Sequence, residues 1–194
     1  RGEPLHTRYF GGGTPSLCPP ELIGGLLEHT ARLFDCSQVE ETTLEANPDD
    51  LTPEYLAALR HVGIDRLSIG VQSFDDDCLR LLNRRHTAGR AIEALRDARR
   101  AGFDNLTIDL IFGIPGFGGD SLRRTLDTAL ETGVEHISAY HLTIESNTAF
   151  GRRMARGTFA PVDEAVSEAE FYEVHDRLTA AGYEHYEVSN FARP

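Results

Sequence analysis

The sequence predicts an α/β fold, a partial (βα) barrel of the TIM type in which parallel strands alternate with helices. Short β-branched and aromatic runs alternate with segments of helical periodicity, and several of the strands are apolar almost throughout. Polar side chains also recur where consecutive strands end. The periodicity alone is equally compatible with a doubly wound open sheet. We favour the barrel because a barrel builds its site at the C-terminal ends of its strands.

Six segments have the β-branched and aromatic composition of strands. The first leads into three glycines, and the fourth is the most apolar, interrupted by a single carboxylate, Asp109. The predicted strands are 7–10, 39–46, 66–71, 105–113, 136–144 and 186–191.

Seven helices are expected between and after these strands. In the first, Leu22, Ile23, Leu26 and Leu27 recur at helical spacing. The second begins with Thr52 as N-cap and proline at the first helical position, and the fourth is closed by glycine. The predicted helices are 20–34, 53–63, 75–83, 87–101, 121–132, 148–156 and 163–181.

The composition fits a soluble globular domain, with 194 residues, 40% hydrophobic and 26% charged. A net charge of −12 argues against a general nucleic-acid or anionic-membrane surface, because both favour clustered Lys and Arg. We find no apolar run of membrane-spanning length and no signal peptide, so we expect a cytoplasmic protein without a membrane span.

The three cysteines, Cys18, Cys36 and Cys78, are widely spaced and lack CxxC or Cys-to-His spacing. Their spacing supports neither a disulfide framework nor a metal site. We expect each of them to be a small buried apolar residue.

The segment Thr7–Pro15 contains the most informative local pattern. A strand-like run ends in Gly11, Gly12 and Gly13, followed by Thr14 and Pro15. A strand, a glycine turn and a helix start together bring backbone N–H groups and a positive helix end to a small polar or anionic group. A plain tight turn between strand and helix is the alternative interpretation, because a glycine loop alone is a weak motif.

The ends of the later strands add further polar groups, namely Glu45 with Asn47, Gln72, Asp109 and the run 138–143. Each has a structural alternative, such as a buried carboxylate satisfied by backbone donors. By the same reasoning Arg84 and Arg85 form a solvated surface pair, His86 caps the neighbouring helix, and His141 is a satisfied histidine at the rim. The residues therefore indicate a pocket of cofactor or nucleotide size at the rim of a barrel, and they do not define a reaction.

Six ordered segments resemble the oxygen-independent coproporphyrinogen III oxidase-like family of radical S-adenosylmethionine (SAM) proteins, and most of all its haem chaperone branch. The resemblance covers essentially the whole chain. The segments are 9–16, 44–48, 69–74, 85–88, 108–116 and 186–194.

The resemblance implies cofactor-binding roles for nine residues. Gly11, Gly12, Gly13 and Thr14 match the segment that receives the methionine end of SAM, and Glu45 matches a SAM-contacting glutamate. Gln72, Arg84, Asp109 and, through 137–138, Thr143 match positions that contact a second SAM in the oxidase.

The family holds a [4Fe–4S] cluster on a CxxxCxxC motif, which the resemblance places upstream of the glycine loop and which these 194 residues lack. We therefore expect a radical SAM core domain truncated at both ends, with barrel units over about 1–160 and a helix and strand over 161–194 leading to a further C-terminal domain. The fragment itself should be unable to assemble the cluster and should be inactive.

Three functions remain in competition at this point. The resemblance implies first a protein that binds the cluster and SAM and delivers haem to an acceptor protein, with haem as an additional ligand and an electron donor as partner. The second is an enzyme that oxidatively decarboxylates coproporphyrinogen III to protoporphyrinogen IX. The third is an ordinary nucleotide-binding barrel without iron. The segments 85–88 and 140–145 favour the chaperone branch.

Overall fold

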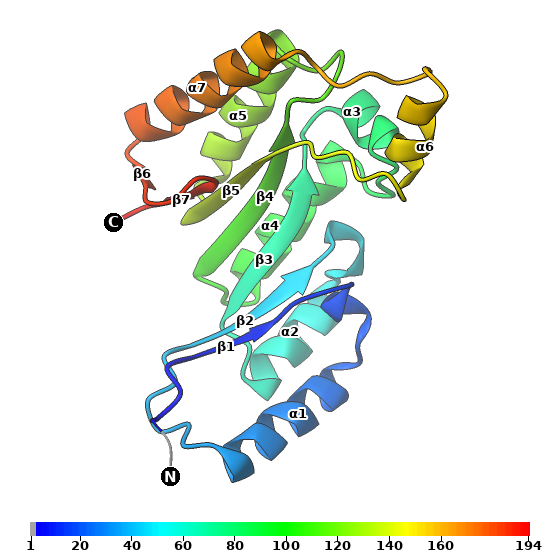
Figure 1. Ribbon diagram of the computed structural model, residues 1–194. Helices are drawn as coiled ribbons and strands as arrows, with labels where there is room; N and C mark the ends of the chain where they lie inside the picture. The colour runs from blue at the N-terminus through cyan, green and yellow to red at the C-terminus, as the bar shows by residue number, and fades with distance from the viewer. Residues whose placement is uncertain (1–2) are drawn as a thin grey trace. The chain divides into compact units, whose positions relative to one another are not determined.

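The computed structural model describes residues 3–194, and its strands follow one another in the order β1-β2-β3-β4-β5-β7-β6 (Figure 1). The pairs β1–β2 and β2–β3 are parallel, whereas β7 is antiparallel to both β5 and β6. The predicted α/β class with a parallel-rich sheet is therefore confirmed. Over the described residues the sheet is not closed.

The first five strands occur close to the predicted positions. Two of them, β2 and β5, are shorter than expected. Strand β2 starts late because a turn precedes it, in which the Val39 amide donates to the Cys36 carbonyl. Strand β5 ends at His141, before the predicted end at residue 144. The strands are β1 (Thr7–Phe10), β2 (Glu41–Ala46), β3 (Arg66–Gln72), β4 (Asn105–Phe112), β5 (His136–His141), β6 (Glu184–His185) and β7 (Asn190–Ala192).

The helices confirm the predicted series and its capping signals. Thr52 accepts a hydrogen bond from the Tyr55 amide, Thr87 accepts one from the Arg90 amide, and Gly63 closes its helix at a φ of 100°. The helices are α1 (Pro20–Leu33), α2 (Pro53–Val62), α3 (Asp76–Leu81), α4 (Ala88–Arg100), α5 (Asp120–Thr132), α6 (Ala149–Ala155) and α7 (Glu164–Ala180), with 3-10 turns η1 (Pro15–Leu17) and η2 (Pro48–Asp50).

The chain divides into two compact units. The first unit runs to Val71 and includes Arg85–Ile108, and the second consists of Gln72–Arg84 and Asp109–Pro194. In the first unit, α1 packs on α2 and α2 packs on α4. Its core contains fully buried strand residues such as Leu44, Leu67 and Leu106, which explains the near-continuous apolar character of these strands.

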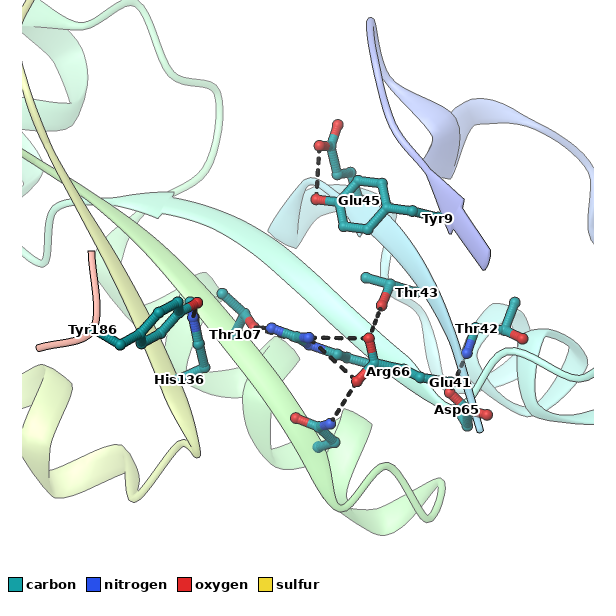
Figure 2. A network of polar contacts seen from close by, with 11 residues as sticks. Tyr9, Glu41, Thr42, Thr43, Glu45, Asp65, Arg66, Thr107, His136 and Tyr186 are labelled. Atoms are coloured by element: carbon teal, nitrogen blue, oxygen red, sulfur yellow. Dashed lines mark hydrogen bonds and ion pairs between the residues drawn. The ribbon is translucent and has the colours of Figure 1, made fainter. Parts of the chain in front are cut away.

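A polar network joins the beginnings of β2, β3 and β4 in the first unit (Figure 2). Arg66 donates to both carboxylate oxygens of Glu41, at 3.0 and 3.2 Å, and to the Thr107 hydroxyl at 3.2 and 2.8 Å. Glu41 also accepts from Thr43 at 2.9 Å and from Asn105 at 3.2 Å. Because this network lies at the N-terminal ends of the strands, it belongs to the stability of the fold.

In the second unit α7 packs on α5 and contacts β5 and β6. The single strand predicted over 186–191 is wrong, because β6 ends at His185, residues 186–189 form a turn, and β7 begins only at Asn190. The Glu187 carboxylate stabilises this turn, since it accepts hydrogen bonds from the Ser189 amide and the Asn190 side chain. The resulting hairpin places β7 antiparallel beside β5.

None of the helices in the described part of the chain combines the length and apolar character that crossing a membrane requires.

The cysteines differ from the expectation in part. Cys78 is buried as predicted, but Cys18 and Cys36 are only half-buried. Burial raises the pKa of the Cys78 thiol to about 11, so very little of it is thiolate near neutral pH. We expect iodoacetamide at pH 8 to label Cys78 at least about tenfold more slowly than Cys36.

Peptide mass spectrometry of the folded chain over time would measure this difference, and the unfolded chain in guanidinium is the control. Equal labelling rates at Cys78 and Cys36 in the folded chain would contradict the buried environment of Cys78.

Candidate functional site

The glycine loop favours glycine, for two different reasons. Gly12 and Gly13 have φ values of 83° and 67°, in the left-handed region that side chains disfavour. A Cβ atom on Gly11 would lie 2.7 Å from Cε1 of Tyr9 and 2.9 Å from Oε1 of Glu45. The backbone here therefore turns sharply and closely approaches the neighbouring strand.

Glu45 lies against this loop, as the sequence predicts for adjacent strand ends. The register pairs Phe10 with Leu44, so Gly11, the first residue after β1, lies beside Glu45 near the end of β2. The Gly12 amide donates to Oε2 of Glu45 at 3.0 Å, and the Tyr9 phenol donates to Oε1 at 2.9 Å. Figure 2 shows the Tyr9 hydroxyl reaching the Glu45 carboxylate. The arrangement leaves an exposed loop with a fixed carboxylate beside it.

The segment after the loop is anchored to the end of β2. The Ser16 hydroxyl donates to Asp50 at 2.6 Å and accepts from the Asn47 amide at 3.2 Å. The Tyr55 hydroxyl donates to the Cys18 carbonyl at 2.9 Å. Burial, together with the nearby Cys18 and Asp50, raises the pKa of Tyr55 to about 12, so this phenol stays a donor. Thr14 is half-buried, and its carbonyl accepts from Leu17 at 3.1 Å.

The segment 85–87 differs from two expectations. Arg85 is exposed but lies 3.7 Å from Asp49 and 3.5 Å from Asp50, so it pairs with η2 and is not merely solvated. His86 does not cap α4, since Thr87 does so; buried His86 donates instead from Nε2 to the Val71 carbonyl at 3.0 Å. The segment thus fixes the ends of β2 and β3.

The other predicted site residues lie on four separate segments of the second unit. Gln72 ends β3 with a φ of 70°, and half-buried Arg84 follows Asn83, which has a φ of 56°. Asp109 is half-buried within β4, and Thr143 is exposed in the loop after β5. A left-handed conformation is strained at Gln72 and is typical of functional sites, whereas asparagine adopts it readily. A shared ligand for these residues stays a prediction.

The strand ends of the second unit are supported by α7. His141 is a satisfied histidine at the rim, as expected, with Nε2 3.0 Å from the Ser167 hydroxyl and its ring edge-on to Phe112. Buried Glu170 accepts a hydrogen bond from the Gly113 amide at 2.7 Å. A carboxylate from α7 therefore holds the turn that ends β4.

Two site-supporting residues were missed in the sequence, Tyr9 and Glu170. Tyr9 carries no local signal, because its partner depends on the register between β1 and β2. Glu170 does have a signal in the local sequence, since it lies in phase with buried Val174 and Leu178 along one face of α7. A carboxylate in the apolar stripe of a helix indicates a buried hydrogen-bonding partner.

Comparison with known proteins gives a consistent result. Residues 2–129 match the family described as the Radical SAM superfamily. The chain is 43% identical over 190 residues to the haem chaperone HemW of Mycobacterium tuberculosis (strain CDC 1551 / Oshkosh), covering 98% of this chain and 49% of that protein. It is 40% identical over 196 residues to the haem chaperone HemW of Bacillus subtilis (strain 168), covering 99% and 51%. The chain thus spans about half the length of the curated relatives it matches.

Among solved structures, the fold is similar to coproporphyrinogen III oxidase (HemN) from Escherichia coli, described as a radical SAM enzyme. The TM-score is 0.84 at 27% identity, covering 98% of this chain and 44% of that one. The archaeal Elp3 of Methanocaldococcus infernus, at 19% identity and a TM-score of 0.73, shares the fold.

Proposed function

We propose, from the premise that this chain belongs to the radical SAM superfamily, that its glycine loop and Glu45 bind the amino-acid end of SAM. Membership implies SAM and a [4Fe–4S] cluster as cofactors. The observation that carries the proposal is the meeting of a carboxylate and a backbone amide at the exits of β1 and β2. A carboxylate accepts hydrogen bonds from an ammonium or hydroxyl group, and glycine amides donate to anionic oxygens.

The loop fits such a ligand sterically. A Cβ atom on Gly12 or Gly13 would meet no other atom within 4 Å, so the space beside their backbone is open. Glu45 retains accepting capacity after its two hydrogen bonds, because a carboxylate has about four lone-pair sites. In this proposal Glu45 orients the ligand, and the loop backbone closes around its amino-acid end.

The cluster does not fit the residues described. Within 3–194 there is no group of three or more His, Cys, Asp or Glu side chains that could hold a metal ion. We therefore place the cluster ligands outside this range and assign no cluster role to Cys18, Cys36 or Cys78. We propose a second set of contacts to SAM for Gln72, Arg84, Asp109 and Thr143.

For the whole protein we propose a haem chaperone that delivers haem to an acceptor protein. The identity of 43% over 98% of the chain to a haem chaperone supports this function over others. Its partners would be haem, an acceptor protein and an electron donor. Oxidation of coproporphyrinogen III is the second candidate, supported by the structural similarity to HemN.

An anaerobic assay separates the two functions. Full-length protein with reconstituted cluster is incubated with SAM, a reductant and coproporphyrinogen III, and the porphyrin products are identified by mass spectrometry. A chaperone leaves coproporphyrinogen III unchanged, while an authentic oxidase assayed in parallel converts it. In a second assay, the chaperone transfers bound haem to an apo-acceptor protein, and the Soret absorbance measures this transfer. Conversion to protoporphyrinogen would overturn the chaperone assignment.

We expect Tyr9→Phe to weaken SAM binding by roughly two- to tenfold, because the variant loses a single hydrogen bond to Glu45, and such a bond contributes about 0.5–1.5 kcal/mol. Isothermal titration of SAM into the reconstituted full-length protein measures this change. Tyr172→Phe is the matched control, since Tyr172 is similarly exposed at 54% against 60% for Tyr9. Equal affinities of both variants and the parent would rule out a positioning role for Tyr9.

A further inference from the structure

Two histidines of the second unit face each other at close range, one on α7 and the other on β6. Nδ1 of His175 lies 2.8 Å from Nδ1 of His185, and the ring centroids are 5.0 Å apart. Both residues are half-buried. Two imidazole nitrogens therefore converge on one point.

The hydrogen bonds define where the protons lie. Nε2 of His185 lies 3.2 Å from the Val188 carbonyl, which can only accept, so this nitrogen carries the proton. In neutral His185 the Nδ1 atom is then unprotonated, and its lone pair can accept a hydrogen bond. His175 must donate from its own Nδ1 to make the 2.8 Å contact. A neutral His175 can carry that proton on Nε2 instead, which leaves two lone pairs aimed at the same point.

Packing holds the His185 ring and the turn before it in place. The His185 ring stacks on buried Phe191, with centroids 4.1 Å apart and planes within 13°. The turn between α7 and β6 is fixed by Tyr183, whose amide donates to the Leu178 carbonyl at 3.1 Å and whose hydroxyl donates to the Val134 carbonyl. A ligand binding between the rings therefore meets a pre-formed pair.

We propose that His175 and His185 bind a divalent transition-metal ion of the zinc, nickel or copper class through their Nδ1 atoms. Imidazole suits these metals, and a ligating histidine usually donates its other N–H to a carbonyl or carboxylate, as His185 does to Val188. With Zn–N bonds of about 2.0–2.1 Å, tetrahedral geometry needs the two nitrogens about 3.3 Å apart. The pair must open by about half an ångström, and both rings must turn so that their lone pairs point at the ion and no longer at each other.

The site would have two protein ligands, with water in the remaining positions, because no third His, Cys, Asp or Glu of residues 3–194 completes a group. Binding exchanges two metal-bound waters for two nitrogens, and the His175 proton moves from Nδ1 to Nε2. The inference is independent of the proposed SAM site at the glycine loop and Glu45, which belongs to the first unit, and it uses none of the residues proposed for the second set of SAM contacts.

The test uses Zn²⁺ as the probe and the whole 194-residue chain. We expect one ion to bind in isothermal titration, and both Nδ1 signals to shift in imidazole ¹⁵N NMR spectra. His175→Gln and His185→Gln should each weaken binding at least about tenfold, since even supporting residues of metal ligands contribute that much. His29→Gln, at an exposed histidine on α1, is the matched control and should retain the affinity.

The NMR measurement on the unmodified chain keeps the test decisive if a variant folds poorly. Zinc binding that leaves both Nδ1 signals unshifted, or that survives both substitutions, would show an adventitious ion only. An absence of binding would show that the two rings form a hydrogen bond and nothing more. Either result overturns the proposal.

Discussion

Replacing Glu45 by alanine should weaken SAM binding by about 10- to 100-fold in the reconstituted full-length protein. The substitution removes the carboxylate that receives the Gly12 amide and the Tyr9 phenol. A hydrogen bond to a charged group contributes about 1.5–3 kcal/mol, and each 1.4 kcal/mol corresponds to about tenfold in affinity. Isothermal titration under anaerobic conditions measures the change directly.

Two further variants serve as comparisons for Glu45→Ala. Glu45→Gln keeps an accepting oxygen but loses the charge, so its affinity should lie between those of Glu45→Ala and the parent. Glu40→Ala changes an exposed glutamate just before β2 and should leave the affinity unchanged. If Glu45→Ala binds SAM as tightly as Glu40→Ala, with equal iron content and equal melting temperature, the assignment of this site is wrong.

The second large effect concerns stability. Arg66→Met should lower the free energy of unfolding by about 2–3 kcal/mol, because it leaves the Glu41 carboxylate partly buried without its cation. The side chains of Arg66 and Glu41 are only 21% and 27% exposed, so water compensates poorly for the loss. Urea denaturation followed by circular dichroism measures the difference.

The exposed pair Arg32 and Glu28 provides the matched control. These side chains are 76% and 75% exposed at 3.8 Å, so Arg32→Met should change the free energy of unfolding by less than about 0.5 kcal/mol. Adding Glu41→Gln to Arg66→Met should recover part of the loss, since the unpaired charge disappears. Equal destabilisation by Arg66→Met and Arg32→Met would refute the structural role of the network.

The local features of the fold could be predicted because each depends on neighbouring residues. Helix starts at Thr52 and Thr87 follow from capping chemistry, and the glycine loop follows from three consecutive glycines after a strand. The meeting of this loop with Glu45 follows from strand order, because the carboxyl ends of adjacent parallel strands share one edge.

Features that depend on distant residues could not be predicted. The strand predicted over 186–191 begins only at Asn190, because β7 pairs with the distant strand β5, and alternation in the sequence there resembles a longer continuous strand. The His86 partner is a carbonyl 15 residues away, which the pattern around His86 does not specify. The role of Arg85 likewise depends on η2, which lies far from it in the sequence.

The contact between Glu170 and the Gly113 amide has a consequence for slow motion. Gly113 starts a turn, where amides normally exchange with solvent readily, yet its N–H is buried on a carboxylate from a helix 57 residues later. Exchange at this amide therefore requires the Glu170 carboxylate to leave it, and we expect this to be slow while α7 stays packed. We expect the deuterium uptake of this one amide to report how often the contact between α7 and the turn opens.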